Sequence, residues 1–183
     1  MAPEQEVLRF QPDRSSLAAT LAGERHRKAL PVAEQTPNLA ANLARALSSL
    51  TRGMTYPSES DYPFEPFWAE LPVEAPLTPD SFRKAARISP RYEITLDPAN
   101  DTLERLTRMW QELIDETDGT GRSHEYAEHV AIFRMLAIVM EAAMTDLTYA
   151  HAGGDDIVRA RIFLFGRLAG GRLAGLRSIS IET

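Results

Sequence analysis

The sequence contains no cysteine. This absence excludes disulfide bonds, thiolate nucleophiles, and zinc or iron–sulfur centres held by cysteine. Long hydrophobic runs are also missing, because the longest apolar stretch, 130–144, is interrupted by Arg134 and Glu141 and is too short to cross a bilayer. Residues 1–14 have neither the basic segment nor the apolar core of a secretory signal. We therefore expect a cytoplasmic protein that has no membrane partner.

Lysine and arginine are absent from residues 53–82, which carry six acidic side chains. Residues 1–52 have a net charge of +2 and residues 83–183 a net charge of −2, so this segment accounts for the whole net charge of −6. Such a local negative field repels nucleic acid phosphates and attracts a basic protein or a metal ion. We expect no direct binding of nucleic acid. On charge alone, a solvated acidic loop remains the simpler interpretation.

The most unusual part of this segment is 58–68, SESDYPFEPFW, in which acids alternate with aromatic rings. The acids are Glu59, Asp61 and Glu65, and the aromatic residues are Tyr62, Phe64, Phe67 and Trp68. A buried strand would not carry three carboxylates, and a solvated loop rarely exposes four aromatic rings. We expect the rings of Tyr62 and Phe64 to anchor the segment to the fold, because aromatic residues beside a strand are more often core than interface.

The first third of the chain predicts an N-terminal extension, 1–36, followed by a domain, 37–183. Thr36-Pro37 has the pattern of a helix N-cap followed by proline at the first helical position. Leucines then recur at helical spacing until Gly53, whose backbone freedom is typical of a helix end. We therefore expect the first helix of the domain to begin at Pro37.

The middle of the chain predicts short strands separated by helices. The expected elements are strands near 64–71 and 92–96, a helix at 78–87, a helix from Asp101 to the turn at 118–121, and a helix from Ser123 to the Gly153-Gly154 break. Because residues 130–144 are apolar nearly all round, the last of these helices should be buried at the centre of the fold.

The C-terminal residues predict a β-hairpin. In 157–165 the even-numbered positions are apolar and lie on one face, whereas Arg159 and Arg161 lie on the other. Gly170-Gly171 supplies the turn, and 173–181 forms the returning strand. Helices thus separate an early pair of strands from a late hairpin. This order predicts an α+β fold with an antiparallel sheet covered by helices.

Four patterns typical of enzymes or metal sites are incomplete. In HEYAEH, 124–129, the two histidines are five residues apart, whereas zinc ligands on one helix face are four apart. The glycine-rich run 166–175 lacks the Lys-Ser or Lys-Thr of a phosphate-binding loop and precedes a strand. DETDGTG, 115–121, lacks calcium ligands at the required positions, and no Gly-x-Ser-x-Gly occurs. We therefore expect no catalytic site and no cofactor.

Two stretches together resemble the nuclease A inhibitor family. They are PSESDYPFEPFWAEL, 57–71, and the terminal LAGLRSISIET, 173–183; the helix expected after Thr36 fits the family as well. The resemblance implies a three-layer α/β/α sandwich around a central antiparallel sheet. It also implies that the protein is not an enzyme but a proteinaceous inhibitor of a metal-dependent, sugar-non-specific DNA/RNA endonuclease.

The resemblance further implies which residues bind the partner. Glu59 matches the first glutamate of the family's acidic motif and Thr183 matches its C-terminal residue, so both carboxylates would ligate a metal held by the nuclease. Asp61 and Glu65 would add further contacts. A nuclease cleft is positive and its Mg²⁺ prefers hard oxygen ligands, so carboxylates can replace phosphates there. The alternative is a non-inhibitory interaction module of the same fold that binds another basic protein.

Overall fold

The computed structural model describes residues 32–58, 62–117 and 123–181. Contacts within the chain divide it into two units, Met1–Gln35 and Thr36–Thr183, and the description below concerns the second unit. The expected N-terminal extension lies almost entirely outside the described residues.

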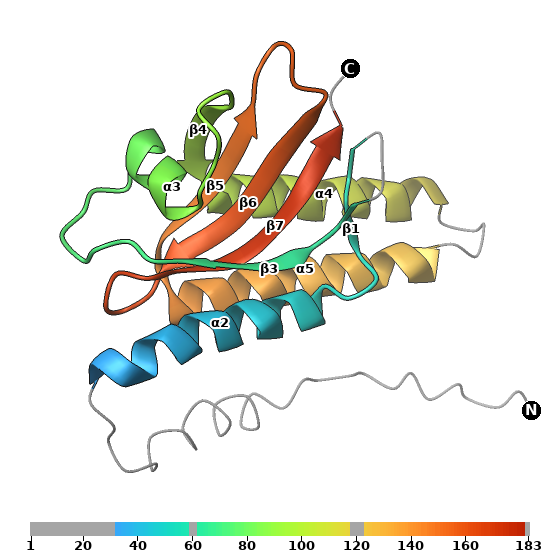
Figure 1. Cartoon of the computed structure of the whole chain (residues 1–183). Helices are drawn as coiled ribbons and strands as arrows, with labels where there is room; N and C mark the ends of the chain where they lie inside the picture. The colour runs from blue at the N-terminus through green and yellow to red at the C-terminus, as the bar shows by residue number, and fades with distance from the viewer. Residues whose placement is uncertain (1–31, 59–61, 118–122, 182–183) are drawn as a thin grey trace, which may run out of the picture. The chain divides into compact units, whose positions relative to one another are not determined.

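A five-stranded antiparallel sheet forms the centre of the fold (Figure 1). Its strand order is β3-β7-β6-β5-β4. The strands are β3 (Glu65–Ala69), β4 (Glu93–Pro98), β5 (Thr145–Gly153), β6 (Arg159–Arg167) and β7 (Leu173–Ile181). A second, two-stranded sheet pairs β1 (Thr55–Tyr56) with β2 (Tyr62–Pro63). The α+β class expected from the sequence is confirmed.

The predicted C-terminal hairpin is also confirmed. Strands β6 and β7 pair antiparallel, from Arg159 opposite Ile181 to Arg167 opposite Leu173. In the turn, Gly170 and Gly171 have φ angles of 98° and 86°. These values lie in the left-handed region, which glycine adopts without the steric cost that a Cβ imposes.

Helices cover both faces of the sheet (Figure 1). Helices α2 (Val32–Leu50), α4 (Ala99–Thr117) and α5 (Ser123–Ala143) bury one face, in a core that includes Leu47, Phe133 and Ile162. The short helix α3 (Pro79–Ala85) buries the other, in a core built on Phe82 and Phe165. No helix within the described ranges is long and apolar enough to cross a membrane.

Helix α3 confirms the predicted start at Thr78-Pro79, although it ends at Ala85, two residues before the expected Arg87. Thr78 caps it, because the Thr78 hydroxyl accepts a hydrogen bond from the Ser81 amide at 3.2 Å while the Ser81 hydroxyl accepts one from the Thr78 amide at 2.8 Å. Pro79 occupies the start of the helix, where a missing amide hydrogen costs nothing. Because its start is stabilised in this way, the short helix places the Phe82 side chain against one face of the sheet.

The structure contradicts the prediction of one helix from Ser123 to Gly153-Gly154. Helix α5 ends at Ala143, and the next residues form β5, which lies between β4 and β6. Hydrogen bonding to a strand on each side outweighs the helical propensity of its alanines, because both neighbours satisfy the β5 backbone. Residues 130–144 are also not buried all round, since Arg134 and Glu141 are exposed and Ile138 is 57% exposed.

Two predicted helix starts are also wrong. Helix α2 begins at Val32, so Thr36 is not its N-cap and Pro37 lies in the second turn, where it removes one backbone hydrogen bond. Helix α4 begins at Ala99, two residues before the expected Asp101. Ala99 is fully buried, so packing against the core accounts for the earlier start of α4.

Gly175 lies where three strands come close together, opposite Phe67 on β3 and Phe165 on β6. A Cβ atom there would lie 2.0 Å from the Leu164 carbonyl oxygen and 2.6 Å from the Phe165 Cα. Since both are backbone atoms, we expect Gly175→Ala to lower the free energy of unfolding by about 1–3 kcal/mol, measured by urea denaturation. Ala142→Ser, which adds one atom on the exposed side of α5, is the control. Equal midpoints for both variants would contradict the close approach.

Candidate partner-binding surface

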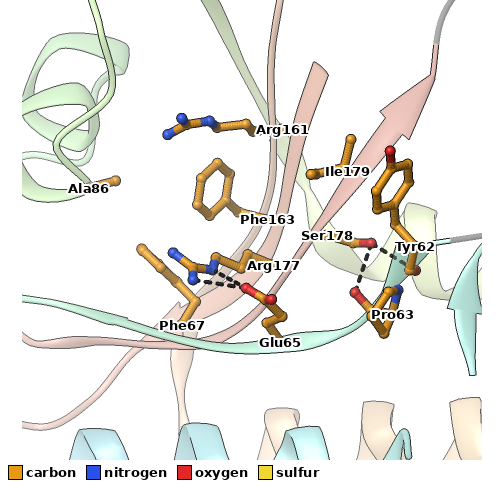
Figure 2. Close-up of a pocket in the computed structure, with 10 residues that line it drawn as sticks. All are labelled: Tyr62, Pro63, Glu65, Phe67, Ala86, Arg161, Phe163, Arg177, Ser178 and Ile179. Carbon is orange, nitrogen blue, oxygen red and sulfur yellow. Dashed lines mark hydrogen bonds and ion pairs between the residues drawn. The ribbon is translucent and has the colours of Figure 1, made fainter. Parts of the chain in front are cut away.

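The acidic segment, defined here as residues 59–61, is bounded by Ser58 and Tyr62, and both of these residues contact strand β7. Glu59, Asp61 and Thr183 themselves lie outside the described residues. On one side of the segment, the Ser58 hydroxyl accepts a hydrogen bond from the Ile181 amide at 3.4 Å. On the other side, the Ser178 hydroxyl lies 3.1 Å from both the Tyr62 and Pro63 carbonyl oxygens, which accept its hydrogen (Figure 2). The chain therefore enters and leaves the acidic segment beside the last strand of the sheet.

The pairing of β1 with β2 explains this placement. Tyr56 lies opposite Tyr62 and Thr55 opposite Pro63, so the residues from 57 to 61 connect two antiparallel strands. Because β2 also contacts β7, this small sheet holds Ser58 and Tyr62, the two ends of the connection, close to the C-terminal half of β7. Local hydrogen bonding, rather than a hydrophobic strand, fixes both ends of the connection.

The aromatic residues of the motif serve different purposes. Phe64 is buried, with its ring centroid 6.3 Å from that of Tyr56 and 6.1 Å from that of Phe133, so its predicted anchoring role is confirmed. Tyr62 is half-buried, and its hydroxyl accepts a hydrogen bond from Arg159. Trp68 is 45% exposed on the outer strand β3, with an arginine guanidinium 5.4 Å from its ring centroid. The motif thus buries some rings and exposes others.

Glu65 is exposed but is paired with an arginine. Its Oε2 atom lies 2.8 Å from Nη2 and 3.0 Å from Nε of Arg177, which stands opposite it on β7 (Figure 2). Both side chains are more than half exposed, and exposed pairs of this kind contribute at most about 1 kcal/mol to stability. The negative charge of Glu65 is therefore largely balanced, and its role in partner binding stays a prediction.

Sequence reasoning placed Arg159 and Arg161 on one face of a strand but did not include Arg177, which lies on the same surface. Arg159 and Arg161 lie on one face of β6, as their spacing predicts. Arg177 on β7 lies opposite Phe163 and is therefore on the same face of the sheet. A strand's own sequence does not reveal its neighbour, so the approach of Arg177 to the β6 arginines had no local signal. The surface beside the acidic segment is therefore basic rather than uniformly acidic.

Tyr92 extends this basic region toward β4. Arg91 donates a hydrogen bond to the Tyr92 hydroxyl at 3.1 Å, and the Arg161 guanidinium lies 5.3 Å from the ring centroid. The Arg91 hydrogen bond, helped by the positive charges of Arg91 and Arg161, lowers the pKa of Tyr92 below its usual 10.0, although burial acts in the opposite direction. The two arginines therefore favour the ionised form of the buried Tyr92 hydroxyl.

The part of the chain that the structure describes contains no cluster of three or more His, Asp or Glu residues able to hold a metal ion.

In comparisons with known proteins, residues 41–183 match the sequence model of a family described as nuclease A inhibitor-like protein. No curated protein matches the chain. The matched range contains the acidic segment, every strand of both sheets, and the last residue.

Proposed function

Because the chain belongs to the nuclease A inhibitor-like family, we propose that it inhibits a metal-dependent, sugar-non-specific endonuclease by occupying the active-site cleft. The observation that carries the proposal is the hydrogen bond between Ile181 and Ser58. It joins the residue that precedes Glu59 to the strand that precedes Thr183. The residues that come shortly before the two carboxylates in the sequence are thereby joined at one end of the sheet, which supports the proposal.

The proposed mechanism uses these carboxylates in place of nucleic acid phosphates. Glu59 and the C-terminal carboxylate of Thr183 bind the Mg²⁺ of the nuclease, because this ion prefers hard oxygen ligands. Asp61 and Glu65 contact the surrounding positive cleft. Strand β7 pairs with β3 as far as Arg177 and with β6 as far as Ile181, whose amide also bonds to Ser58. Because β7 is held in this way, we expect little ordering entropy to be lost when the last residues bind. In this proposal the chain carries no catalytic group of its own.

We also propose that the fold is the three-layer α/β/α sandwich that the family resemblance implies. The support is that α2, α4 and α5 pack on one face of the central sheet and α3 on the other. In this arrangement Ser58 and Tyr62, which flank residues 59–61, lie beside β7 and not on a helical layer.

A non-inhibitory interaction module is the second candidate. The observation that favours it is the basic surface beside the acidic segment, where Arg159, Arg161 and Arg177 outnumber the single described carboxylate, Glu65. A surface of mixed charge selects a partner that has both acidic and basic patches, which a uniformly basic cleft does not offer. Under this candidate the protein binds such a partner without blocking catalysis.

Titration of a nuclease separates the two candidates. The purified protein is added in increasing amounts to a Mg²⁺-dependent, sugar-non-specific endonuclease from the same cells, and cleavage of DNA and RNA is followed. We expect cleavage of both substrates to cease at one protein per nuclease. Complex formation by gel filtration with cleavage unchanged would instead support the interaction module.

Blocking the C-terminal carboxylate tests the metal-binding part of the mechanism. We expect an amidated Thr183 to weaken inhibition by about tenfold or more, because the nuclease metal loses a charged ligand. The melting temperature should not change, since the amide replaces a group beyond the last paired residue of β7. The same protein with a tag at the N-terminus is the control. Full inhibition by the amidated protein would contradict metal binding by the C-terminus.

A further inference from the structure

A pocket of about 300 Å³ opens on the α3 face of the sheet (Figure 2). Phe67 and Phe163 contribute aromatic surface to it, and Ile179 and Pro63 add apolar walls. An apolar cavity of roughly 150 Å³ accommodates benzene. The pocket is therefore large enough for a ring together with one attached polar group, and small-molecule sites of this size are typically apolar with a few polar groups.

Two arginines stand on either side of Phe163 in this pocket. Arg161 lies opposite Ile179 and Arg177 lies opposite Phe163, so the two guanidinium groups are diagonal neighbours on adjacent strands (Figure 2). Long side chains at diagonal positions on one face of a sheet are within reach of each other, so the two positive charges repel. Glu65 balances Arg177, through Nε and Nη2.

Arg161 has no carboxylate partner in the part of the chain that the structure describes. Among residues 32–58, 62–117 and 123–181, no carboxylate lies within ion-pair distance of it, and its contact is with the aromatic ring of Tyr92. Arg159, two residues earlier on the same face, adds a further positive charge and contacts Tyr62. The pocket therefore joins an apolar floor to a positive charge that the described fold does not neutralise.

We propose that this pocket binds a small, free organic anion: a carboxylate attached to an aromatic ring or an apolar body of similar size. The carboxylate pairs with the planar guanidinium of Arg161, a geometry that permits two parallel hydrogen bonds. The apolar body packs against Phe67 and Phe163. Glu65 acts against binding, because it holds Arg177 and repels a second carboxylate. The proposal does not depend on the nuclease-inhibitor function, because binding of a free anion is measured without a nuclease.

Benzoate is the probe for the small anion. Binding is measured by NMR titration of the full-length protein, with sodium chloride keeping the ionic strength constant. We expect benzoate to shift the resonances of Phe163, Ile179 and Arg177 and to raise the melting temperature, because a ligand that binds only the folded state stabilises it. Acetate, which lacks the ring, and benzylamine, which lacks the negative charge, should bind at least about tenfold more weakly. Equal binding of benzoate and benzylamine would overturn the proposal.

Three substitutions assign the contacts. Arg161→Gln should weaken benzoate binding by about tenfold or more. The melting temperature of the free protein should change little, because the lost contact with the Tyr92 ring is offset by the removal of repulsion between like charges. Glu65→Gln should strengthen binding, because it frees Arg177. Arg134→Gln, on the exposed side of α5, is the control and should change nothing. Unchanged benzoate affinity in Arg161→Gln, measured by NMR on a variant that melts as the wild type does, would overturn the proposal.

A further arm distinguishes a free ligand from a side chain of a partner protein. A short capped peptide containing one glutamate between glycines presents the same carboxylate without a ring. Binding of benzoate but not of the peptide supports a free small molecule. Binding of the peptide through Arg161, with no binding of benzoate, would overturn the proposal and would assign the pocket to an acidic side chain of a partner.

Discussion

Phe82→Ala is expected to lower the free energy of unfolding by about 3–5 kcal/mol. Phe82 is fully buried and is the residue that attaches α3 to the sheet. Its ring stacks on that of Phe165 with centroids 4.7 Å apart, and meets Phe163 edge-on at 5.2 Å and Phe67 at 6.0 Å. Truncation removes all three ring contacts and leaves a cavity, because the strands that carry the other rings are fixed by hydrogen bonds.

A loss of this size is a large part of the roughly 5–15 kcal/mol that stabilises a typical domain. Urea denaturation followed by circular dichroism measures it. Phe82→Leu, which keeps most of the side-chain volume, should lose less than half as much. Ile138→Ala is the control, because Ile138 is 57% exposed on α5 and its truncation should cost within about 0.5 kcal/mol. If Phe82→Ala and Ile138→Ala unfold alike, the second core does not depend on α3.

Glu59→Ala is expected to weaken nuclease binding by about 2–5 kcal/mol, which is a factor of roughly 30 to 5,000 in the inhibition constant. This cost reflects a metal ion in the nuclease that is left without a carboxylate ligand in a site from which water has been excluded. The melting temperature should remain that of the wild type, because the neighbouring residues Ser58 and Tyr62 are held to β7 without the Glu59 side chain.

Inhibition constants and melting temperatures together complete the test of Glu59. Inhibition constants are determined for the wild type, for Glu59→Ala, and for Glu112→Ala as a control, since Glu112 is exposed on α4 and lies far from Ser58 in the sequence. Only Glu59→Ala should lose inhibition. A Glu59→Ala protein that melts early yet inhibits fully would show that this glutamate supports the fold and not the interface.

Local sequence patterns predicted those elements whose signals are contained in a few consecutive residues. The Thr78-Pro79 pair fixed the start of α3, and alternation around Gly170-Gly171 predicted the β6–β7 hairpin. Strand β5 was not predictable in this way. Its alanines suit a helix, and only pairing with β4 and β6, which lie apart from it in the sequence, makes it a strand.

The same distinction applies to the candidate site. The acidic residues could be recognised because they lie within a few positions of one another, and the anchoring of Phe64 follows from its place beside a strand. The pairing of Glu65 with Arg177 and the nearness of Arg177 to Arg161 depend on strand register, which joins residues more than a hundred positions apart in the first case. Charge counted along the chain therefore missed the basic side of this surface.

The strand order has a consequence for how the protein is made on the ribosome. Strand β3 pairs with β7, which is synthesised roughly 100 residues later. At translation rates of about 5–20 residues per second, β3 waits on the order of 5–20 s for its neighbour. During that interval its backbone is free to pair with other nascent chains. Pro66, which cannot donate a hydrogen bond, and the charge of Glu65 make such pairing unfavourable, so these two residues protect an unfinished sheet from aggregation.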